Sequence, residues 1–301
     1  MCKESKGNQM LVSIIVPFYK GNKYVSQICS SIEKNVKNLA SKNCNCKIEC
    51  IFINDSPSID VILAEQNYTF PIKVYNHKKN SGIQQARVTG LKYAQGEYII
   101  FLDQDDELLE DTVYYDINNI GNADILVCNA FMEDEQGELK KLYRTKGMIK
   151  NVKQLDAYIY GHNRIASPGQ CLIKKASIPK EWTEYILEKN GSDDLFLWIL
   201  MLEKKLIFKT SDKVTYIHKF TGTNLSSDIT KMNMSSLNMI NYLKKIQYID
   251  NQTIKKIKKD KVFTDRIYKE KNKKRIIILM LKNIDVILNQ IKWKLNSWVI
   301  W

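Results

Sequence analysis

The first hundred residues alternate between short apolar runs and amphipathic stretches. Residues 11–17 read LVSIIVP, a β-branched run ending in proline that predicts a buried strand. Residues 22 to about 36 place apolar side chains at helical spacing and predict a helix. We expect further strands at residues 48–54, 72–76 and 98–102, a helix from the turn at residue 55 to about residue 67, and another over residues 82–94. These β–α steps predict a doubly wound, mostly parallel α/β sheet.

The second half of the chain has a less regular pattern. We expect a strand at residues 124–128, a hairpin over 133–142, a helix near 152–160, a strand near 170–173, a helix over 193–204, and strands at 206–209 and 214–218. After residue 223 the pattern becomes that of basic amphipathic helices. This predicts a domain of residues 1–223, with a nucleotide-binding half at 11–130 and an acceptor-binding half at 131–223, and a helical extension at 224–301.

The positive charge lies mainly in that extension. The whole chain carries +13, and residues 251–301 hold fourteen Lys and Arg against four Asp and Glu, which leaves about +3 for the rest. Two basic clusters, Lys255, Lys256, Lys258, Lys259, Lys261 and Lys271, Lys273, Lys274, Arg275, precede a run of apolar residues. In a helix, Ile276, Ile277, Leu279, Met280, Ile284, Ile287, Leu288, Ile291 and Trp293 would fall largely on one face, with Trp298 and Trp301 beyond.

Such a basic amphipathic helix is typical of attachment to an anionic membrane surface. The alternative is a helical hairpin that packs on the rest of the chain or in a homodimer. Nucleic acid is not an expected partner, because no aromatic readout element accompanies the charge.

Several classes of protein are excluded by composition. No run of about 18 uncharged apolar residues is present, so no membrane-spanning helix is predicted. The start, MCKESKGNQM, lacks the apolar core of a signal peptide, and the seven cysteines are therefore expected to be reduced thiols. Cys44, Cys46 and Cys50 do not have the spacing of a usual zinc site. We predict a cytoplasmic protein, peripheral at the inner face of the cell membrane.

Three segments follow predicted strands at the edge where such sheets bind ligands: residues 17–19, 54–56 and 103–106. In the third, Asp103, Asp105 and Asp106 follow directly on an apolar strand. Carboxylates crowded in this way repel each other, and a divalent cation relieves the repulsion. The cluster predicts a site for Mn²⁺ or Mg²⁺ with a diphosphate. An acidic helix start is the simpler alternative.

Four segments, in this order and spacing, resemble the motifs of family-2 glycosyltransferases of the GT-A fold. They are VSIIVPFYKGNKYVSQICSSI, IFINDSPS, NSGIQQARVTGLKYAQGEYIIFLDQDD and GSDDLFLWILML. The resemblance covers about residues 11–220 and implies a Rossmann-like GT-A sheet. It implies transfer of a sugar from a nucleoside diphosphate donor, usually UDP, to an acceptor hydroxyl, with inversion and with Mn²⁺ or Mg²⁺. The implied acceptor is a glycan or lipid-linked glycan, in capsule, exopolysaccharide or glycolipid synthesis.

The resemblance also implies roles for individual residues. It places donor contacts at Pro17, Phe18, Tyr19, Asp55, Gly82, Arg87, Asp103 and Gln104, metal ligands at Asp103, Asp105 and His218, and the catalytic base at Asp194. Asp55 would accept a hydrogen bond from the base, and His218 would contact the metal or the diphosphate. A general base of this kind contributes ~10²–10⁴-fold to a rate.

The chain departs from the family pattern at several positions. Asn54-Asp55-Ser56-Pro57 replaces a frequent Asp-Asp-Gly-Ser, which changes the turn, and Val88 and Asp193 replace a common Asn and Glu. No Q-x-x-R-W motif is present, which favours single additions over processive synthesis. His77 and His162 show no partner pattern, and no role is predicted for them.

Two other functions compete with this one. A nucleotidyltransferase would need a glycine-rich phosphate loop after the first strand, and PFYKGN is not one. A non-catalytic subunit that binds a sugar nucleotide or a membrane is the alternative from a different class.

Overall fold

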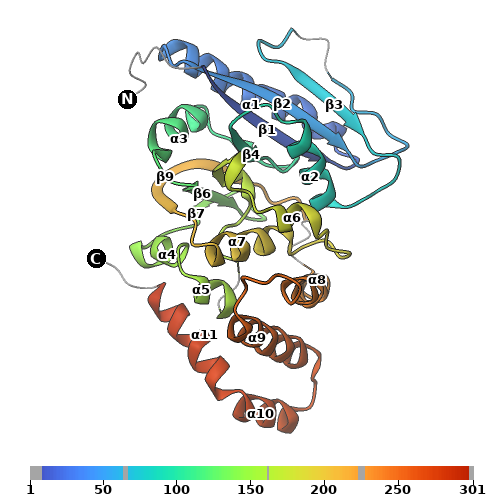
Figure 1. Ribbon diagram of the computed structural model, residues 1–301, viewed down its shortest axis with the longest axis vertical. Helices are drawn as coiled ribbons and strands as arrows, with labels where there is room; N and C mark the ends of the chain where they lie inside the picture. The colour runs from blue at the N-terminus through green and yellow to red at the C-terminus, as the bar shows by residue number, and fades with distance from the viewer. Residues whose placement is uncertain (1–8, 64–66, 161–162, 223–227, 298–301) are drawn as a thin grey trace. The chain divides into compact units, whose positions relative to one another are not determined.

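The computed structural model describes residues 9–63, 67–160, 163–222 and 228–297 (Figure 1). The chain forms two compact units. Unit 1 comprises Met1–Tyr143, Ile165–Ile178 and Leu206–Gly222, and unit 2 comprises Arg144–Arg164, Pro179–Lys205 and Thr223–Trp301. These units are defined by compactness, whereas the predicted domain, halves and extension are defined by function. The predicted division therefore stays a prediction.

Unit 1 is built on a sheet that, over the described residues, has nine strands in the order β3-β2-β1-β4-β8-β6-β9-β5, with β7 paired to β6. The strands are β1 (Met10–Phe18), β2 (Cys46–Asn54), β3 (Ile72–Asn76), β4 (Tyr98–Phe101), β5 (Glu107–Leu108), β6 (Ile125–Glu133), β7 (Leu139–Lys141), β8 (Cys171–Lys174) and β9 (Phe208–His218). Three helices accompany them: α1 (Asn22–Ser41), α2 (Ile83–Tyr93) and α3 (Thr112–Ile120). These strands and helices match most of the predicted ones to within a few residues.

The parallel half of the sheet determines where the site lies. β1 pairs in parallel with β2 on one side and with β4 on the other, and β3 pairs in parallel with β2. The chain therefore runs outward from β1 to β3 and returns to β4, so the strand order reverses beside β1. In open α/β sheets, ligands bind at the carboxyl ends of the strands at such a reversal. The ends of β1 and β4 meet there.

The core explains why these segments form strands and helices. β1 is buried from Val12 to Phe18, as its continuous β-branched run predicts for a central parallel strand. α2 packs on β1 and β2 and contains a glycine that lowers its intrinsic helix propensity. A Cβ at Gly90 would lie 2.2 Å from Cγ2 of Ile15, so the helix approaches the sheet too closely for any other residue.

The helix predicted between residues 55 and 67 is wrong over the described part of that segment. Residues 55–63 form a turn and extended chain, and residues 64–66 lie outside the described residues. The Asn22 side chain holds this chain in place, because its amide donates to the Asp60 carbonyl and its oxygen accepts from the Ile62 N–H, both at 2.9 Å. Tertiary contacts with α1 thus override the local helix signal.

The two strands predicted at 206–209 and 214–218 form one strand, β9. It pairs in parallel with β6, and register irregularities near Val127 and Asn129 accommodate the polar residues between the two predicted segments. The hairpin predicted over 133–142 is present as the β6–β7 pair.

Unit 2 is helical. Its helices are α4 (Lys146–Asn151), α5 (Leu155–Tyr160), α6 (Lys180–Glu184), α7 (Asp193–Glu203), α8 (Ile229–Leu243), α9 (Asn251–Lys269), α10 (Lys273–Lys282) and α11 (Ile284–Asn296). α7 is buried from Leu195 to Met201, and α5 contacts α7, α9 and α11. None of the helices described for this chain is long and apolar enough to cross a membrane.

The single apolar face predicted for the end of the chain is wrong. The segment divides at Asn283 into α10 and α11, and Trp293 is buried while Leu288 and Ile291 are exposed. Within α11, Val286 and Trp293 are buried and the other large apolar residues are wholly or partly exposed, so the apolar residues of the run do not all lie on one face. Trp298 and Trp301 lie outside the described residues.

Candidate functional site

The predicted carboxylate cluster lies in the turn that follows β4. The Asp106 N–H donates to the Asp103 carbonyl at 3.1 Å and closes the turn. Gln104 fastens it to the end of β1, because its Oε1 accepts from the Tyr19 N–H at 2.9 Å and its Nε2 donates to the Tyr19 carbonyl at 3.1 Å. The Gln104 side chain, which was predicted to contact the donor, therefore joins the ends of β1 and β4.

Asp103 is paired within unit 1. Its Oδ1 lies 2.5 Å from Nη2 of Arg87, a buried residue of α2, and its Oδ2 accepts from the Ser167 hydroxyl at 2.9 Å. Arg87 was predicted to border the nucleotide, and the structure places it as the ion-pair partner of Asp103. Ser167 was missed by the sequence reasoning, since it lies 64 residues away in the chain.

Asp106 anchors the end of β9. Only 1% exposed, it accepts hydrogen bonds from the Tyr216 hydroxyl, from Nδ1 of His218 at 3.1 Å and from the Lys219 N–H at 2.8 Å. Burial raises the pKa of the Asp106 carboxyl. Burial alone would lower the pKa of His218, but the hydrogen bond to Asp106 and the nearby carboxylates outweigh it and raise that pKa to about 9. His218 is therefore an imidazolium at neutral pH when no metal is bound.

Asp105 differs from its two neighbours. No other side chain in the described ranges forms a hydrogen bond or ion pair with its carboxylate, although the His218 charge lies close enough to act on it. Burial, and then repulsion from Asp106 and Asp103, raises the pKa of Asp105 to about 6. In this turn, Asp103 and Asp106 therefore have hydrogen-bond or ion-pair partners among other side chains, whereas Asp105 has none in the described ranges.

The donor set fits a divalent cation that also binds phosphate. Within the described ranges, no group of three or more His, Cys, Asp or Glu side chains is gathered closely enough to hold a metal alone. Mg²⁺ is usually bound by one or two carboxylates, with phosphates and water as the remaining ligands. Asp105 has the free carboxylate for this role, and Asp103 and His218 would have to exchange or share their present partners.

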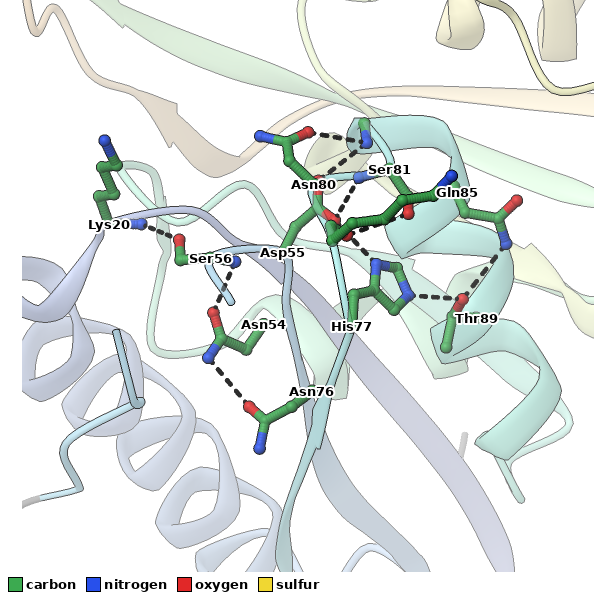
Figure 2. Close-up of polar contacts among 12 residues, drawn as sticks. Lys20, Asn54, Asp55, Ser56, Asn76, His77, Asn80, Ser81, Gln85 and Thr89 are labelled. Carbon is green, nitrogen blue, oxygen red and sulfur yellow. Dashed lines mark hydrogen bonds and ion pairs between the residues drawn. The ribbon is translucent and has the colours of Figure 1, made fainter. Parts of the chain in front are cut away.

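The second predicted contact, Asp55, directly follows β2 and lies in a network of hydrogen bonds (Figure 2). Its carboxylate accepts from the Ser81 N–H at 2.7 Å, the Gly82 N–H at 2.8 Å and Nδ1 of His77 at 2.8 Å. Gly82 directly precedes α2 and has φ = 89°, a conformation that favours glycine. Asp55 therefore fixes the start of α2 and also benefits from the positive end of that helix.

His77, for which no role was predicted, connects three elements. It follows β3, its Nδ1 donates to Asp55 of the β2 end, and its Nε2 lies 2.9 Å from Oγ1 of Thr89 in α2 (Figure 2). In the neutral ring this leaves Nε2 to accept from the Thr89 hydroxyl. The signal that could have found it is its position, because His77 directly follows a parallel strand at the same edge as Asp55.

The altered turn after β2 is stabilised by its own side chains. Oδ1 of Asn54 accepts from the Ser56 N–H at 2.9 Å, and the Ser56 hydroxyl accepts from the Lys20 N–H at 2.8 Å (Figure 2). Nδ2 of Asn54 donates to Asn76 of β3 at 2.9 Å. Asn54 and Ser56 thus connect the ends of β1, β2 and β3 through hydrogen bonds.

The segment at the end of β1 presents a single aromatic ring. Pro17 and Phe18 are buried, and Phe18 belongs to the apolar core. Tyr19 is 46% exposed, and its backbone is held by Gln104. Of the predicted nucleobase contacts at this position, only the Tyr19 ring is on the surface.

Asp194 lies in unit 2, at the second residue of α7. Its Oδ2 accepts from Nδ2 of Asn163 at 2.6 Å, and its Oδ1 accepts from the Leu195 N–H at 2.7 Å. The positive end of α7 also stabilises its negative charge. Asn163 was missed because it lies 31 residues earlier, in a segment whose pattern predicts no element. His162, beside it, lies outside the described residues.

The chain is similar in sequence to two bacterial proteins of known name. The chain is 27% identical over 223 residues to the poly(ribitol-phosphate) beta-N-acetylglucosaminyltransferase TarP of Staphylococcus aureus, over 71% of this chain and 64% of TarP. It is 38% identical over 103 residues to the minor teichoic acid biosynthesis protein GgaB of Bacillus subtilis, over 33% of this chain and 11% of GgaB. The matched segments thus span less than two thirds of both relatives.

Solved structures share the fold. S. aureus TarS 1–349 in complex with UDP-GlcNAc superposes with a TM-score of 0.59 at 18% identity, over 92% of this chain and 81% of that one. The complex of TarS 1–349 with UDP gives 0.54 at 16% identity, over 87% and 73%. At these identities the likeness shows the fold alone, and it confirms the predicted GT-A class. The model of glycosyl transferase family 2 matches residues 13–182, more than half of the chain, and the chain therefore belongs to that family.

Proposed function

We propose that the chain is a metal-dependent, inverting glycosyltransferase that moves a sugar from a nucleoside diphosphate donor to an acceptor hydroxyl. The observation that carries the proposal is Asp105, a carboxylate with a pKa of about 6 at the reversal point of the sheet, whose neighbours are satisfied while it is not. A carboxylate without side-chain partners is well suited to bind a cation that arrives together with the substrate. UDP is the proposed nucleotide, because TarS, with the same fold, was solved with UDP and UDP-GlcNAc.

The acceptor we propose is a surface glycan or a lipid-linked precursor of one. The names of two relatives refer to poly(ribitol-phosphate) and to teichoic acid. This supports a role in capsule, exopolysaccharide or glycolipid synthesis. Single additions of sugar are proposed because the sequence has no Q-x-x-R-W motif.

The residues of unit 1 would bind and orient the donor. Asp105, with Asp103, would hold Mn²⁺ or Mg²⁺, and Arg87 would keep Asp103 in place. When bound, the metal supplies Lewis-acid stabilisation of the negative charge on the departing diphosphate. His218, oriented by the hydrogen bond from its Nδ1 to Asp106, would have an Nε2–H available for a phosphate oxygen.

The nucleobase would be held at the ends of β1 and β2. Tyr19 offers an exposed ring for stacking. Asp55 already accepts three hydrogen bonds, and a carboxylate offers about four lone-pair positions, which leaves room for one N–H of a base. A pyrimidine with an imide N–H meets this requirement, which favours uracil over cytosine.

Asp194 would act as the base. Its carboxylate would take the proton of the acceptor hydroxyl as the oxygen attacks the anomeric carbon, and Asn163 would fix the orientation of the carboxylate through Oδ2. The bond from the anomeric carbon to the diphosphate breaks as the new glycosidic bond forms, which inverts the configuration.

Asp194→Asn tests this role. We expect UDP affinity to be retained and transfer to fall by ~10²–10⁴-fold, because the amide cannot accept the proton. Asp156→Asn is the matched control, an exposed carboxylate of the same unit whose described partner is Lys256. Unchanged turnover in Asp194→Asn would remove it from the base position.

A screen of nucleotide sugars for Mn²⁺-dependent hydrolysis tests the activity itself. We expect one UDP-sugar to be hydrolysed by the unaltered chain and not by Asp105→Asn. Tight binding of UDP with no hydrolysis or transfer of any sugar would instead favour the non-catalytic subunit.

We also propose that the chain works at the inner face of the cell membrane as a peripheral protein. The support is the basic, apolar end of unit 2.

A further inference from the structure

Helix α10 is apolar but buries no residue. Six consecutive residues from Ile276 to Leu281 are large and apolar, and Ile277, Ile278, Met280 and Leu281 are exposed. Helices in water owe most of their stability to the burial of an apolar face, and α10 has none within the described chain. This composition is expected when another phase or molecule covers the helix.

Helix α11 carries two apolar stripes, of which only one is used inside unit 2. Val286 and Trp293, seven residues apart, are buried. Ile284, Leu288, Ile291 and Leu295 recur at helical spacing and are all exposed. We call the exposed apolar residues of α10 and of this second stripe the α10–α11 apolar surface: Ile277, Ile278, Met280, Leu281, Ile284, Leu288, Ile291 and Leu295.

The same end of the chain has a large excess of positive charge. Its four acidic residues already have cationic partners: Asp260 with Lys261, Asp265 with Lys269, Glu270 with Arg275 and Asp285 with Lys259, at 2.6–4.0 Å. No acidic side chain in the described ranges forms an ion pair with Lys255, Lys258, Arg266, Lys271, Lys273 or Lys274. All six of these cationic residues are exposed.

Two cavities bring the charged and apolar groups together. A cavity of about 410 Å³ between α9 and α10 is lined by Arg266, Lys269 and Arg275, by Glu270, which pairs with Arg275, and by Ile278 and Leu279. A second, of about 240 Å³, shares Arg266 and is lined by Lys255 and Lys258 and by Val262 and Phe263. A planar guanidinium binds phosphate oxygens in pairs, and the apolar lining suits the carbon chain next to a headgroup.

We propose that the α10–α11 apolar surface and the basic cavities of α9 dock on an anionic phospholipid surface, with headgroup phosphates at Arg266 and its neighbours. Each Lys or Arg close to such a surface strengthens binding about fivefold. A second copy of the chain fits less well, because two such surfaces would bring like charges together. The inference deepens the membrane location proposed above, but its test does not need the transfer reaction.

The test is co-sedimentation of the full chain with vesicles of phosphatidylcholine alone or mixed with phosphatidylglycerol. The apolar variant is Leu281→Ser with Leu288→Ser, at positions 68% and 59% exposed. Its matched control is Ile62→Ser with Ile207→Ser, at 68% and 60% exposed positions of unit 1. We expect the chain and the control to bind the anionic vesicles, the apolar variant to bind about tenfold more weakly, and all three to bind neutral vesicles poorly.

A charge variant tests the cavities. Lys258→Gln with Arg266→Gln should bind anionic vesicles at least tenfold more weakly at low salt, with the difference shrinking as salt is added. Equal binding by the apolar variant and its control, or equal binding to neutral and anionic vesicles, would overturn the proposal. So would self-association by light scattering that only the apolar variant loses, without vesicle binding, since a second copy would then cover the surface. UDP affinity of each variant, measured without vesicles, separates this outcome from failure of the proposed donor site.

Discussion

Asp55 and Asp105 lie at the same edge of the parallel half of the sheet, yet the hydrogen bonding of their carboxylates is opposite. The Asp55 carboxylate accepts hydrogen bonds from two backbone N–H groups and from His77. The Asp105 carboxylate experiences burial and the repulsion of two neighbouring carboxylates, which its own backbone N–H and the His218 charge offset only in part. Asp55 is therefore organised by the chain itself, whereas Asp105 is where we propose that a metal ion binds.

The contrast has an energetic side. A buried carboxylate with its hydrogen bonds in place contributes to stability, and one that lacks them costs stability. Asp105 is therefore expected to lower the stability of the fold at the position where we propose that a metal binds, as residues of functional sites often do.

Replacement of Asp105 should have the largest effect. We expect Asp105→Asn to lower transfer by about 10³-fold or more, since a bound metal contributes several kcal/mol that an amide at this position cannot retain. The measurement is kcat/KM with Mn²⁺ at saturating acceptor. Asp116→Asn in α3 is the control, a buried carboxylate whose pKa is raised to about 7 by its burial and which lies outside the proposed site. If Asp105→Asn turned over as fast as the control, the metal-binding role that distinguishes Asp105 from Asp55 would be contradicted.

Asp55→Asn should affect stability and donor binding together. The amide turns one acceptor into a donor that faces N–H groups, which costs about 1–3 kcal/mol of unfolding free energy. Urea denaturation and UDP titration measure the two effects. Asp60→Asn, in the same loop, should leave both unchanged. If the Asp55→Asn protein were as stable as the unaltered one, the hydrogen bonds to Asp55 would not be what holds the start of α2.

The stability of the metal-free protein should depend on pH through Asp105. Its folded pKa of about 6 lies above its ordinary value of 3.8, so the folded state binds more protons than the unfolded state between these values. Stability therefore falls as pH rises through this range, by on the order of 2 kcal/mol for this group. The difference between the unaltered chain and Asp105→Asn, measured by denaturation at pH 4.5 and pH 7 with a chelator, isolates it. A difference that does not change with pH would contradict the assignment.

The smallest effect is expected at His77. His77→Ala removes one of three donors to Asp55 and leaves the Thr89 hydroxyl with Gln85 but without its acceptor, so UDP affinity should fall about fivefold, as for a hydrogen bond worth about 1 kcal/mol. His77→Gln should restore part of the loss, because its amide can still donate to Asp55. Equal affinity in all three proteins would make His77 a packing residue only.

The two carboxylates also show what the sequence could predict. β1, β2 and β4 are rich in apolar residues, and the segments that follow β2 and β4 lie at one edge of a parallel sheet, so the position of Asp55 and Asp105 followed from pattern alone. The side chains that interact with this turn could not be predicted from the pattern. Ser167 and Arg87 reach Asp103 from other elements, and Gln104 was assigned to the donor although both its amide atoms bind the Tyr19 backbone.

The two wrong local predictions, the helix after Asp55 and the single apolar face near the end of the chain, have the same origin. The turn after Asp55 carries a helix-cap signal, but contacts from Asn22 fix it as extended chain. The apolar run after Lys273 reads as one amphipathic helix, but Asn283 ends the first helix and the second turns part of its apolar residues inward. In both cases, packing between segments distant in the chain decides the outcome, and periodicity does not contain that information.

A crystal grown with UDP and Mn²⁺ and measured at the manganese edge tests the central claim most directly. We predict one anomalous peak at about 2.0–2.6 Å from a carboxylate oxygen of Asp105 and from the oxygens of the diphosphate. A peak bound elsewhere, or ordered UDP whose diphosphate lies apart from Asp105 with no metal between them, would contradict the account.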